Sequence, residues 1–171
     1  MEAYQNDATD LSAVLDPTLR VGFLLWHLGQ AVRIRGERAV APLDLTVTQL
    51  QSLVVLSLNP GLSSAELARR CGVTAPSMGK AVDALSARGL VEPDPHPRHG
   101  RIIELRATPA GMAMAVRGQA MLVPLEQDML ERFSSQEQRE LKDLLLRLVM
   151  KLTPQAVLTP PEPPMAPEAL I

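Results

Sequence analysis

Apolar residues recur at helical spacing over most of the chain from residue 17 to residue 152. A period of 3.6 brings residues i, i+3, i+4 and i+7 to one face of a helix. The first such segment starts at Pro17, a residue that suits a first helical turn, and Pro42 ends it. Because its apolar side chains form two stripes, we expect this helix to pack both on its own domain and on a second subunit.

A second helix is predicted from a capping box at Thr46 to the stop signal Asn59-Pro60-Gly61. Two short helices joined by a tight turn are predicted to follow it. Their signals are N-caps, a first-turn proline and terminal glycines: Ser63, Gly72, Thr74, Pro76 and Gly89. This arrangement is typical of a helix-turn-helix.

The second short helix is predicted to have two different faces. Met78, Val82 and Leu85 fall within about 60° of one another at 100° per residue, so we expect them to be buried. The opposite face is small and polar, with one cation: Pro76, Ser77, Lys80, Ala84 and Ala87. Such a face suits entry into a DNA groove about 12 Å wide.

An alternating pattern predicts a β-hairpin after the helix pair, with strands at about 90–93 and 101–107. Thr108-Pro109 then begins a fifth helix, in which Pro124 is expected to cause a kink. A sixth helix opens at Ser134 and carries leucines at near-heptad spacing. The six prolines of residues 153–171 favour an extended or disordered tail. The predicted fold class is therefore mostly α with a small β-hairpin wing.

Composition and charge agree with this class. The chain has 171 residues, 46% of them hydrophobic, but four aromatic residues, which favours a core of aliphatic side chains on helices. The net charge is −2, whereas residues 63–106 carry net +2, which points to a polyanionic partner for that segment. A single cysteine, no apolar run of membrane-spanning length and no signal pattern predict a cytoplasmic protein without a membrane partner.

Two segments carry a family resemblance: LTVTQLQSLVVLSLNPGLSSAELARRCGVTAPSMGKAVDALSARGLVE and, after the hairpin, TPAG. With the order of the helices, they resemble the MarR family of dimeric bacterial transcription regulators over roughly residues 19–152. The resemblance implies a winged helix-turn-helix DNA-binding domain at 46–108, dimerisation helices at 17–45 and 109–152, a loose segment at 1–16 and the tail at 153–171. It also implies a homodimer whose first, fifth and sixth helices intertwine.

The resemblance further implies that residues 74–88 enter the major groove of double-stranded DNA and that a wing at about 93–101 reaches the minor groove. A two-fold dimer requires a roughly palindromic operator. The expected DNA-binding residues are Thr74, Pro76, Ser77, Lys80, Arg98, His99 and Arg101. Among them, Lys80 is expected on a phosphate, and Arg98 and Arg101 suit a narrow minor groove. The simpler alternative for both arginines is a solvated hairpin tip.

The wing departs from the family pattern at one position. Members commonly carry Asp-x-Arg before the return strand, and here His99 stands at the aspartate and Arg101 at the arginine. Either Asp94 takes over the orientation of Arg101, or the stiff loop alone holds it. A metal site at His96 and His99 is not expected, because the ligands are few and no helix supports their spacing.

The resemblance also implies a small-molecule pocket between the first, second and fifth helices. Its candidate residues on the first helix are Trp26, His27, Gln30 and Arg33. They suit a small aromatic carboxylate or a lipophilic effector, with Arg33 or His27 pairing an anion. The alternative is that Trp26 is an ordinary core or dimer residue.

The resulting hypothesis is a sequence-specific DNA-binding homodimer, a repressor released when a small ligand shifts the spacing of its two recognition helices. No catalytic motif, metal site or cofactor site is expected. Two alternatives stay open. One is a winged-helix protein-interaction module, and the other is a redox switch through Cys71, whose simpler role is core packing.

Overall fold

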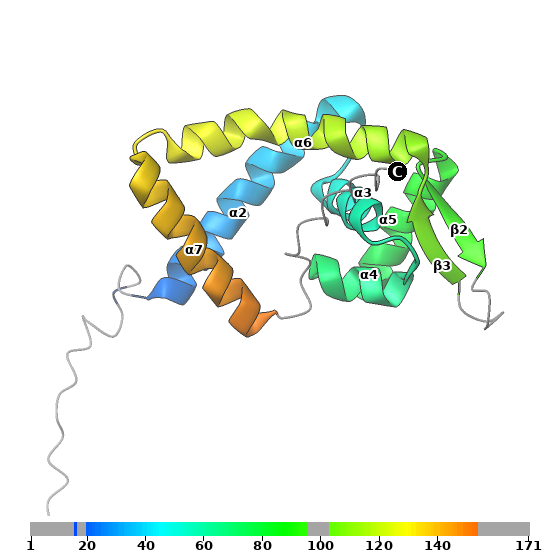
Figure 1. The fold of residues 1–171 in the computed structure, drawn as a ribbon, viewed down its shortest axis with the longest axis horizontal. Helices are drawn as coiled ribbons and strands as arrows, with labels where there is room; N and C mark the ends of the chain where they lie inside the picture. The colour runs from blue at the N-terminus through cyan, green and yellow to red at the C-terminus, as the bar shows by residue number, and fades with distance from the viewer. Residues whose placement is uncertain (1–15, 17–19, 96–102, 154–171) are drawn as a thin grey trace, which may run out of the picture.

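The computed structural model describes residue 16 and residues 20–95 and 103–153. Figure 1 shows helix α6 running along one edge of the molecule, with α3, α4, α5 and the strands toward one end and α7 toward the other. The helices and strands, in chain order, are α2 (Val21–Val40), the 3-10 turn η2 (Ala41–Leu43), α3 (Val47–Leu58), β1 (Leu62–Ser63), α4 (Ser64–Cys71), α5 (Ala75–Ala87), β2 (Val91–Pro95), β3 (Ile103–Ala107), α6 (Pro109–Leu130) and α7 (Ser135–Leu152). The predicted fold class is confirmed.

The predicted helix starts after the first helix are confirmed by their caps. Thr46 and Ser134 each form a reciprocal capping box, with Gln49 and Glu137 respectively. The side chain of Thr108 accepts a hydrogen bond from the Gly111 N–H in the first turn of α6. Each cap satisfies N–H groups that have no partner within the helix, which fixes where the helix begins.

The start of α2 differs from the prediction. Its N-cap is Arg20, which makes no side-chain cap hydrogen bond, so the helix begins at Val21 and not near Pro17. Pro17 itself lies outside the described residues. Helix α6 passes through Pro124 as one helix, and the kink expected there stays a prediction.

The sheet has three strands in the order β1-β3-β2, all antiparallel. The hairpin β2–β3 was predicted, whereas β1 was missed because a two-residue strand shows no alternation. Leu62 and Ser63 of β1 lie opposite Leu105 and Glu104 of β3. The third strand therefore joins the start of the helix-turn-helix directly to the wing.

Strand β2 runs two residues beyond the end that we predicted at about 93, and so includes Pro95 as well as Pro93. Both are tolerated because β2 is an edge strand and because of its register. Leu105, opposite Pro93, directs its carbonyl to the Gly61 N–H on the far side, at 3.0 Å. The N–H and C=O of one strand residue point to the same side, so Leu105 directs neither group toward β2. Pro93 therefore stands in a pair without hydrogen bonds, where its missing N–H costs nothing. The wing loop thus starts after Pro95.

The core lies under the helix-turn-helix, where α3, α4, α5, β3 and α6 meet. Its fully buried large side chains are Leu50, Leu53, Leu56, Leu67, Met78 and Leu85. Glycines let α6 approach closely: a Cβ on Gly118 would lie 2.4 Å from Leu50 Cδ1. The core thus holds the helix-turn-helix firmly to the start of α6.

Within the described residues, no single helix is long and apolar enough to cross a membrane. Taken together, helices α2 and α3 have the length and apolar composition of a membrane span, but the pair is bent by 77°.

Candidate nucleic-acid interface and ligand pocket

The helix-turn-helix is built from α4 and α5 and closed by a left-handed glycine. Gly72 has φ +65°, a conformation that side chains rarely adopt, and it ends α4 as predicted. The next residue, Val73, donates its N–H to the Ala68 carbonyl at 3.1 Å. Thr74 then caps α5, accepting from the Ser77 N–H at 3.4 Å. The turn fixes the direction in which α5 leaves α4.

Helix α5 buries one face and exposes the other. Met78 and Leu85 are fully buried and Ala81 nearly so, while Val82 is half-buried. Four of the seven residues that we expected to contact DNA lie on the N-cap and the N-terminal half of α5, and all four are exposed: Thr74, Pro76, Ser77 and Lys80. The hydroxyls of Thr74 and Ser77 lie 2.9 Å apart. This face therefore presents two hydroxyls and one ammonium group to solvent.

The C-terminal end of α5 is held by Arg88. Its guanidinium donates to the carbonyl of Leu43 at 3.1 Å and to the carbonyl of Asp44, and it lies 3.9 Å from the Asp44 carboxylate. Asp44, whose carbonyl Arg88 binds, has the left-handed φ of +53° in the link between α2 and α3. The recognition-type helix is thus tied to the segment that joins the two preceding helices.

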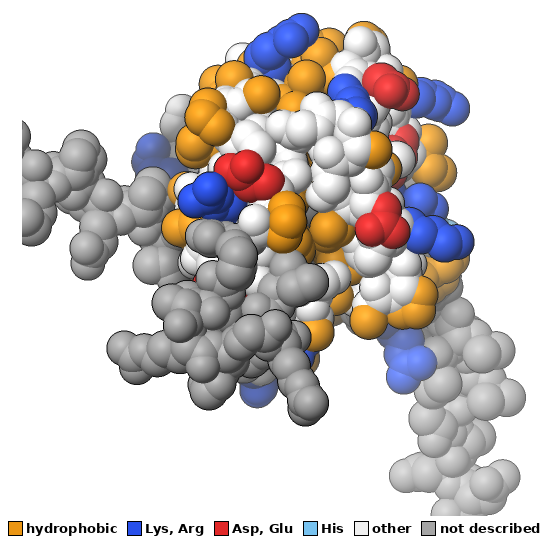
Figure 2. Space-filling view, turned by 90° about the vertical axis from the view of Figure 1, so that its right-hand side faces the viewer, with side chains coloured by type: hydrophobic (Ala, Val, Ile, Leu, Met, Phe, Trp, Pro, Cys, Tyr) orange, Lys and Arg blue, Asp and Glu red, His pale blue; other side chains and the backbone are white. Residues whose placement is uncertain are grey.

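The wing is only partly described. Arg98, His99 and Arg101 lie outside the described residues, as does His96. On the outer face of the hairpin, Arg106 Nε lies 2.9 Å from the Glu92 carboxylate directly across the strands. Figure 2 shows acidic and basic side chains interspersed on this side of the molecule, with apolar side chains between them. A DNA contact here would rest on individual side chains and not on a uniform basic field.

A cavity of about 560 Å³ lies between α2, α3, α6 and the helix-turn-helix turn. Its size falls in the range of small-molecule sites. It is lined by Gly29, Val32, Arg33, Gly36, Glu37, Val47, Thr48, Gln51, Cys71, Val73, Gln119, Leu122, Leu125, Glu126 and Met129. We call it the central pocket.

One of the four predicted pocket residues, Arg33, lines the central pocket. Its Nε donates to Gln30 at 3.2 Å, and no carboxylate of the described residues lies within ion-pair distance of it. Trp26 continues the lining stripe of α2 one turn beyond the pocket and is 61% exposed. The His27 ring contacts those of Phe23 and Trp26, with centroids 4.1 and 4.7 Å away; it is tilted against the first and edge-on to the second. Gln30, His27 and Trp26 are therefore outside the lining.

Most of the pocket lining could not be read from the sequence, because it comes from three helices and a turn. Glu37 lines it while accepting a hydrogen bond from the Val47 N–H at 3.1 Å. The part that was readable is the stripe at Gly29, Arg33 and Gly36, with the spacing i, i+4 and i+7 of one helix face.

Cys71 packs against the core from the wall of this pocket. Burial raises the pKa of its thiol above the ordinary value of 9.0, and a hydrogen bond with Ser52 offsets part of that rise. The thiolate is the reactive form of cysteine. A raised pKa thus argues against a thiol poised for peroxide sensing, and agrees with a packing role.

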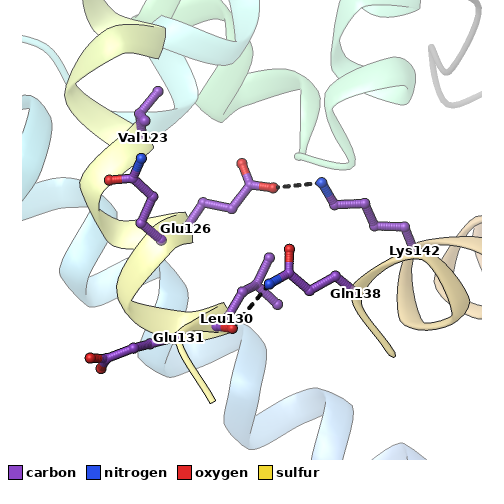
Figure 3. Close-up of a pocket in the computed structure, with 7 residues that line it drawn as sticks. Val123, Glu126, Leu130, Glu131, Gln138 and Lys142 are labelled. Carbon is purple, nitrogen blue, oxygen red and sulfur yellow. Dashed lines mark hydrogen bonds and ion pairs between the residues drawn. The ribbon is translucent and has the colours of Figure 1, made fainter. Parts of the chain in front are cut away.

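A second hollow, of about 260 Å³, lies at the elbow between α6 and α7. Figure 3 shows Glu126 and Lys142 pointing toward each other across it, at 3.1 Å. Gln138 donates to the Leu130 carbonyl at 3.3 Å on the same side. Glu126 and Lys142 neutralise each other, and the remaining charged side chain in the lining is the carboxylate Glu131, so the hollow offers less to an anionic ligand than the central pocket. No cluster of three metal-ligating side chains occurs among the described residues.

A capped helix-turn-helix, a third strand beside it and a following hairpin define a winged helix-turn-helix protein. The chain is 35% identical over 128 residues to the HTH-type transcriptional repressor Rv2887 of Mycobacterium tuberculosis, covering 75% of this chain and 92% of that one. Residues 43–102 match the family model described as MarR family. The protein belongs to the MarR family.

Solved structures agree with this membership. The crystal structure of Rv2887 in complex with p-aminosalicylic acid has a TM-score of 0.66 and 33% identity, covering 75% of this chain and 98% of that one. The structure of Rv2887 in complex with DNA has a TM-score of 0.63 and 34% identity, covering 75% and 97%. Apo MarR from E. coli, at 22% identity and a TM-score of 0.69 over 76% and 97%, shares the fold.

Proposed function

We propose that the protein is a homodimeric, sequence-specific transcriptional repressor that inserts α5 into the major groove of a palindromic operator. The observation that supports this proposal most directly is the exposed N-terminal face of α5. Thr74, Ser77 and Lys80 lie there, on a helix whose opposite face is buried in the core. The structure of the related repressor with DNA supports this assignment. In the proposal, residues 46–108 bind DNA, and Arg98, His99 and Arg101 belong to the wing.

The dimer would form through 17–45 and 109–152. Apolar side chains of α2 and α7 are exposed in one subunit, among them Trp26 at 61%, Leu144 at 54% and Leu152 at 70%. A monomer rarely leaves so much apolar surface in water. The leucine seam of α7 and the two-stripe pattern of α2 support burial against a second copy.

The effector would be a small aromatic acid bound in the central pocket. The relative Rv2887, crystallised with salicylic acid and with p-aminosalicylic acid, supports this class. In this chain Arg33 is the better candidate than His27 for the carboxylate, since it lines the pocket and Gln30 holds its Nε. A bidentate guanidinium–carboxylate pair would orient the ring against the apolar walls, among them Val32 and Leu122.

The DNA assignment is tested by selecting bound duplexes from a random pool and measuring Kd against salt concentration. We expect affinity to fall steeply with salt and Lys80→Ala to lower the slope of log K against log salt by about one. Lys151→Ala, on α7, is the matched control and should leave the slope unchanged. Failure to enrich any sequence, with no salt dependence of partner binding, would instead favour a protein-interaction module.

The effector assignment is tested by titrating salicylate into the protein and following Trp26 fluorescence or heat. We expect Arg33→Ala to weaken salicylate binding by roughly tenfold, the scale of a charged hydrogen bond. Arg38→Ala, an exposed change one helix turn beyond Arg33, serves as the control. Equal salicylate affinity in Arg33→Ala and in the wild type would refute this role. The proposal gives the protein no catalytic step.

A further inference from the structure

The helix-turn-helix turn is itself part of the pocket wall. Cys71 and Val73, on either side of Gly72, line the same cavity as the α2 and α6 side chains. The residue after Val73 is Thr74, the N-cap of α5. A molecule in the pocket and a DNA duplex on α5 would therefore act on two sides of one short segment.

Directly behind this wall lies Ser52, the one fully buried polar side chain of the core among the described residues. Its hydroxyl is 2.8 Å from the Thr48 carbonyl oxygen and 3.4 Å from the sulfur of Met78. Cys71 and Val73 of the turn pack against the core cluster to which Met78 belongs. Thr48 and Cys71 line the pocket, while Met78 belongs to α5, so Ser52 joins the pocket wall to the recognition helix.

The two ends of α5 are held differently. At the C-terminal end, Arg88 binds two backbone carbonyls of the α2–α3 link. At the N-terminal end, the cap hydrogen bond from the Ser77 N–H to Thr74 is long, at 3.4 Å. A displacement of the turn would thus move the end of α5 that carries Thr74 and Ser77, while the far end stays in place.

We propose that the turn at Cys71–Val73 is the coupling element of this repressor: a group in the central pocket that presses on this turn displaces it, and Ser52 and Met78 pass the displacement to α5 within the same subunit. This inference rests on the proposed function and deepens it. It assigns the loss of DNA affinity to a tilt of α5 inside one subunit, in addition to any change of spacing between subunits. Ser52 is a positioning residue here, because it touches neither ligand nor DNA.

The test uses the single cysteine of the chain and needs no effector. Methyl methanethiosulfonate transfers a methylthio group to Cys71: the thiol sulfur forms a disulfide with it, and methanesulfinate and the thiol proton leave. We expect the modified wild type to bind selected DNA at least about fivefold more weakly, the lower end of common allosteric effects. Dithiothreitol should restore affinity, and Cys71→Ser should not respond to the reagent.

Two further variants make the result specific. In Cys71→Ser/Gln119→Cys the same adduct sits on the α6 wall of the pocket, and we expect DNA affinity to change less than about twofold. In Ser52→Ala, whose unmodified DNA affinity should stay near the wild type, we expect the effect of Cys71 modification to shrink to about twofold or less.

Three results would overturn the proposal: full DNA affinity of the fully modified wild type, an equal loss from the Gln119→Cys adduct, or an undiminished effect in Ser52→Ala. Loss of helical signal on modification would also count against it, since the adduct has pocket volume to occupy. Failure of the proposed function is a separate result, because then the unmodified wild type would select no DNA at all.

Discussion

The substitution Gly111→Ala tests how α6 is joined to the winged helix-turn-helix. A Cβ at Gly111 would lie 2.0 Å from the carbonyl oxygen of Leu90 and 3.3 Å from Leu53 Cδ2. That oxygen accepts the Thr108 N–H at 3.1 Å, and Gly111 donates its own N–H to the Thr108 hydroxyl at 3.0 Å. One methyl group therefore displaces a backbone segment and two hydrogen bonds at the start of α6.

The expected cost follows from these contacts. Overpacking a tight site costs about 1–3 kcal/mol, the cap and the backbone hydrogen bond about 1 kcal/mol each, and the helix preference of alanine returns up to about 1 kcal/mol. The net destabilisation is about 3 kcal/mol. For a chain of this size, about 2–4 °C per kcal/mol converts it to a fall in Tm of roughly 6–12 °C.

The assay is thermal unfolding followed by circular dichroism at one protomer concentration, because association raises the apparent Tm. Gly79→Ala is the matched control: it lies inside α5, and nothing stands within 4 Å of an added Cβ. There we expect Tm to rise by about 2–4 °C. A Gly111→Ala variant that melts at or above the wild type would refute the packing argument.

Three more outcomes are expected. Arg101→Ala should weaken binding to selected DNA, measured by fluorescence anisotropy, if the wing reaches the minor groove; unchanged affinity would favour the solvated-tip interpretation. Leu148→Glu, on the leucine seam of α7, should shift the protein toward monomer in analytical ultracentrifugation, while Gln136→Glu on the same helix should not. Hydrogen bonds from Arg70 and Arg69 lower the pKa of Glu66 below its ordinary 4.5, so its contribution to stability is present above that pH and is lost as pH falls through the lowered value. Glu66→Gln should therefore lose less Tm than the wild type between pH 5 and pH 3, and parallel losses would contradict this.

Local signals in the sequence predicted the caps and the turn well, because their chemistry is complete within four residues. Thr46 with Gln49 and Ser134 with Glu137 form the expected boxes. Features set by distant segments were missed. Strand β1 exists because Leu62 meets Leu105, and the tie between Arg88 and the Leu43 carbonyl spans 45 positions. Neither pairing can be recognised from the local pattern of residues.

The lining of the central pocket was also only partly predictable from the sequence. A cavity lies between α2, α3 and α6, where the ligand pocket was expected, and Arg33 lines it. Trp26 and His27 were chosen for their chemistry, but their place along α2 puts them beyond the body of the domain, next to Phe23. A helix face is readable from spacing alone, whereas the length of that face that a neighbour covers depends on where the neighbouring helix ends.

The energies involved suit control through the turn. A tenfold change in DNA affinity corresponds to about 1.4 kcal/mol, which is the scale of one helix N-cap. The core side chain of Leu85, near the far end of α5, is fully buried and costly to displace, while the Thr74 cap is exposed and its hydrogen bond is long. If the displaced turn lies about 1.4 kcal/mol above the resting one, a ligand that presses on Val73 must bind the displaced turn about a hundredfold better: about tenfold to offset that cost and about tenfold more to lower DNA affinity tenfold. An effector of modest affinity, binding without unfolding any of the core, is sufficient for such a switch.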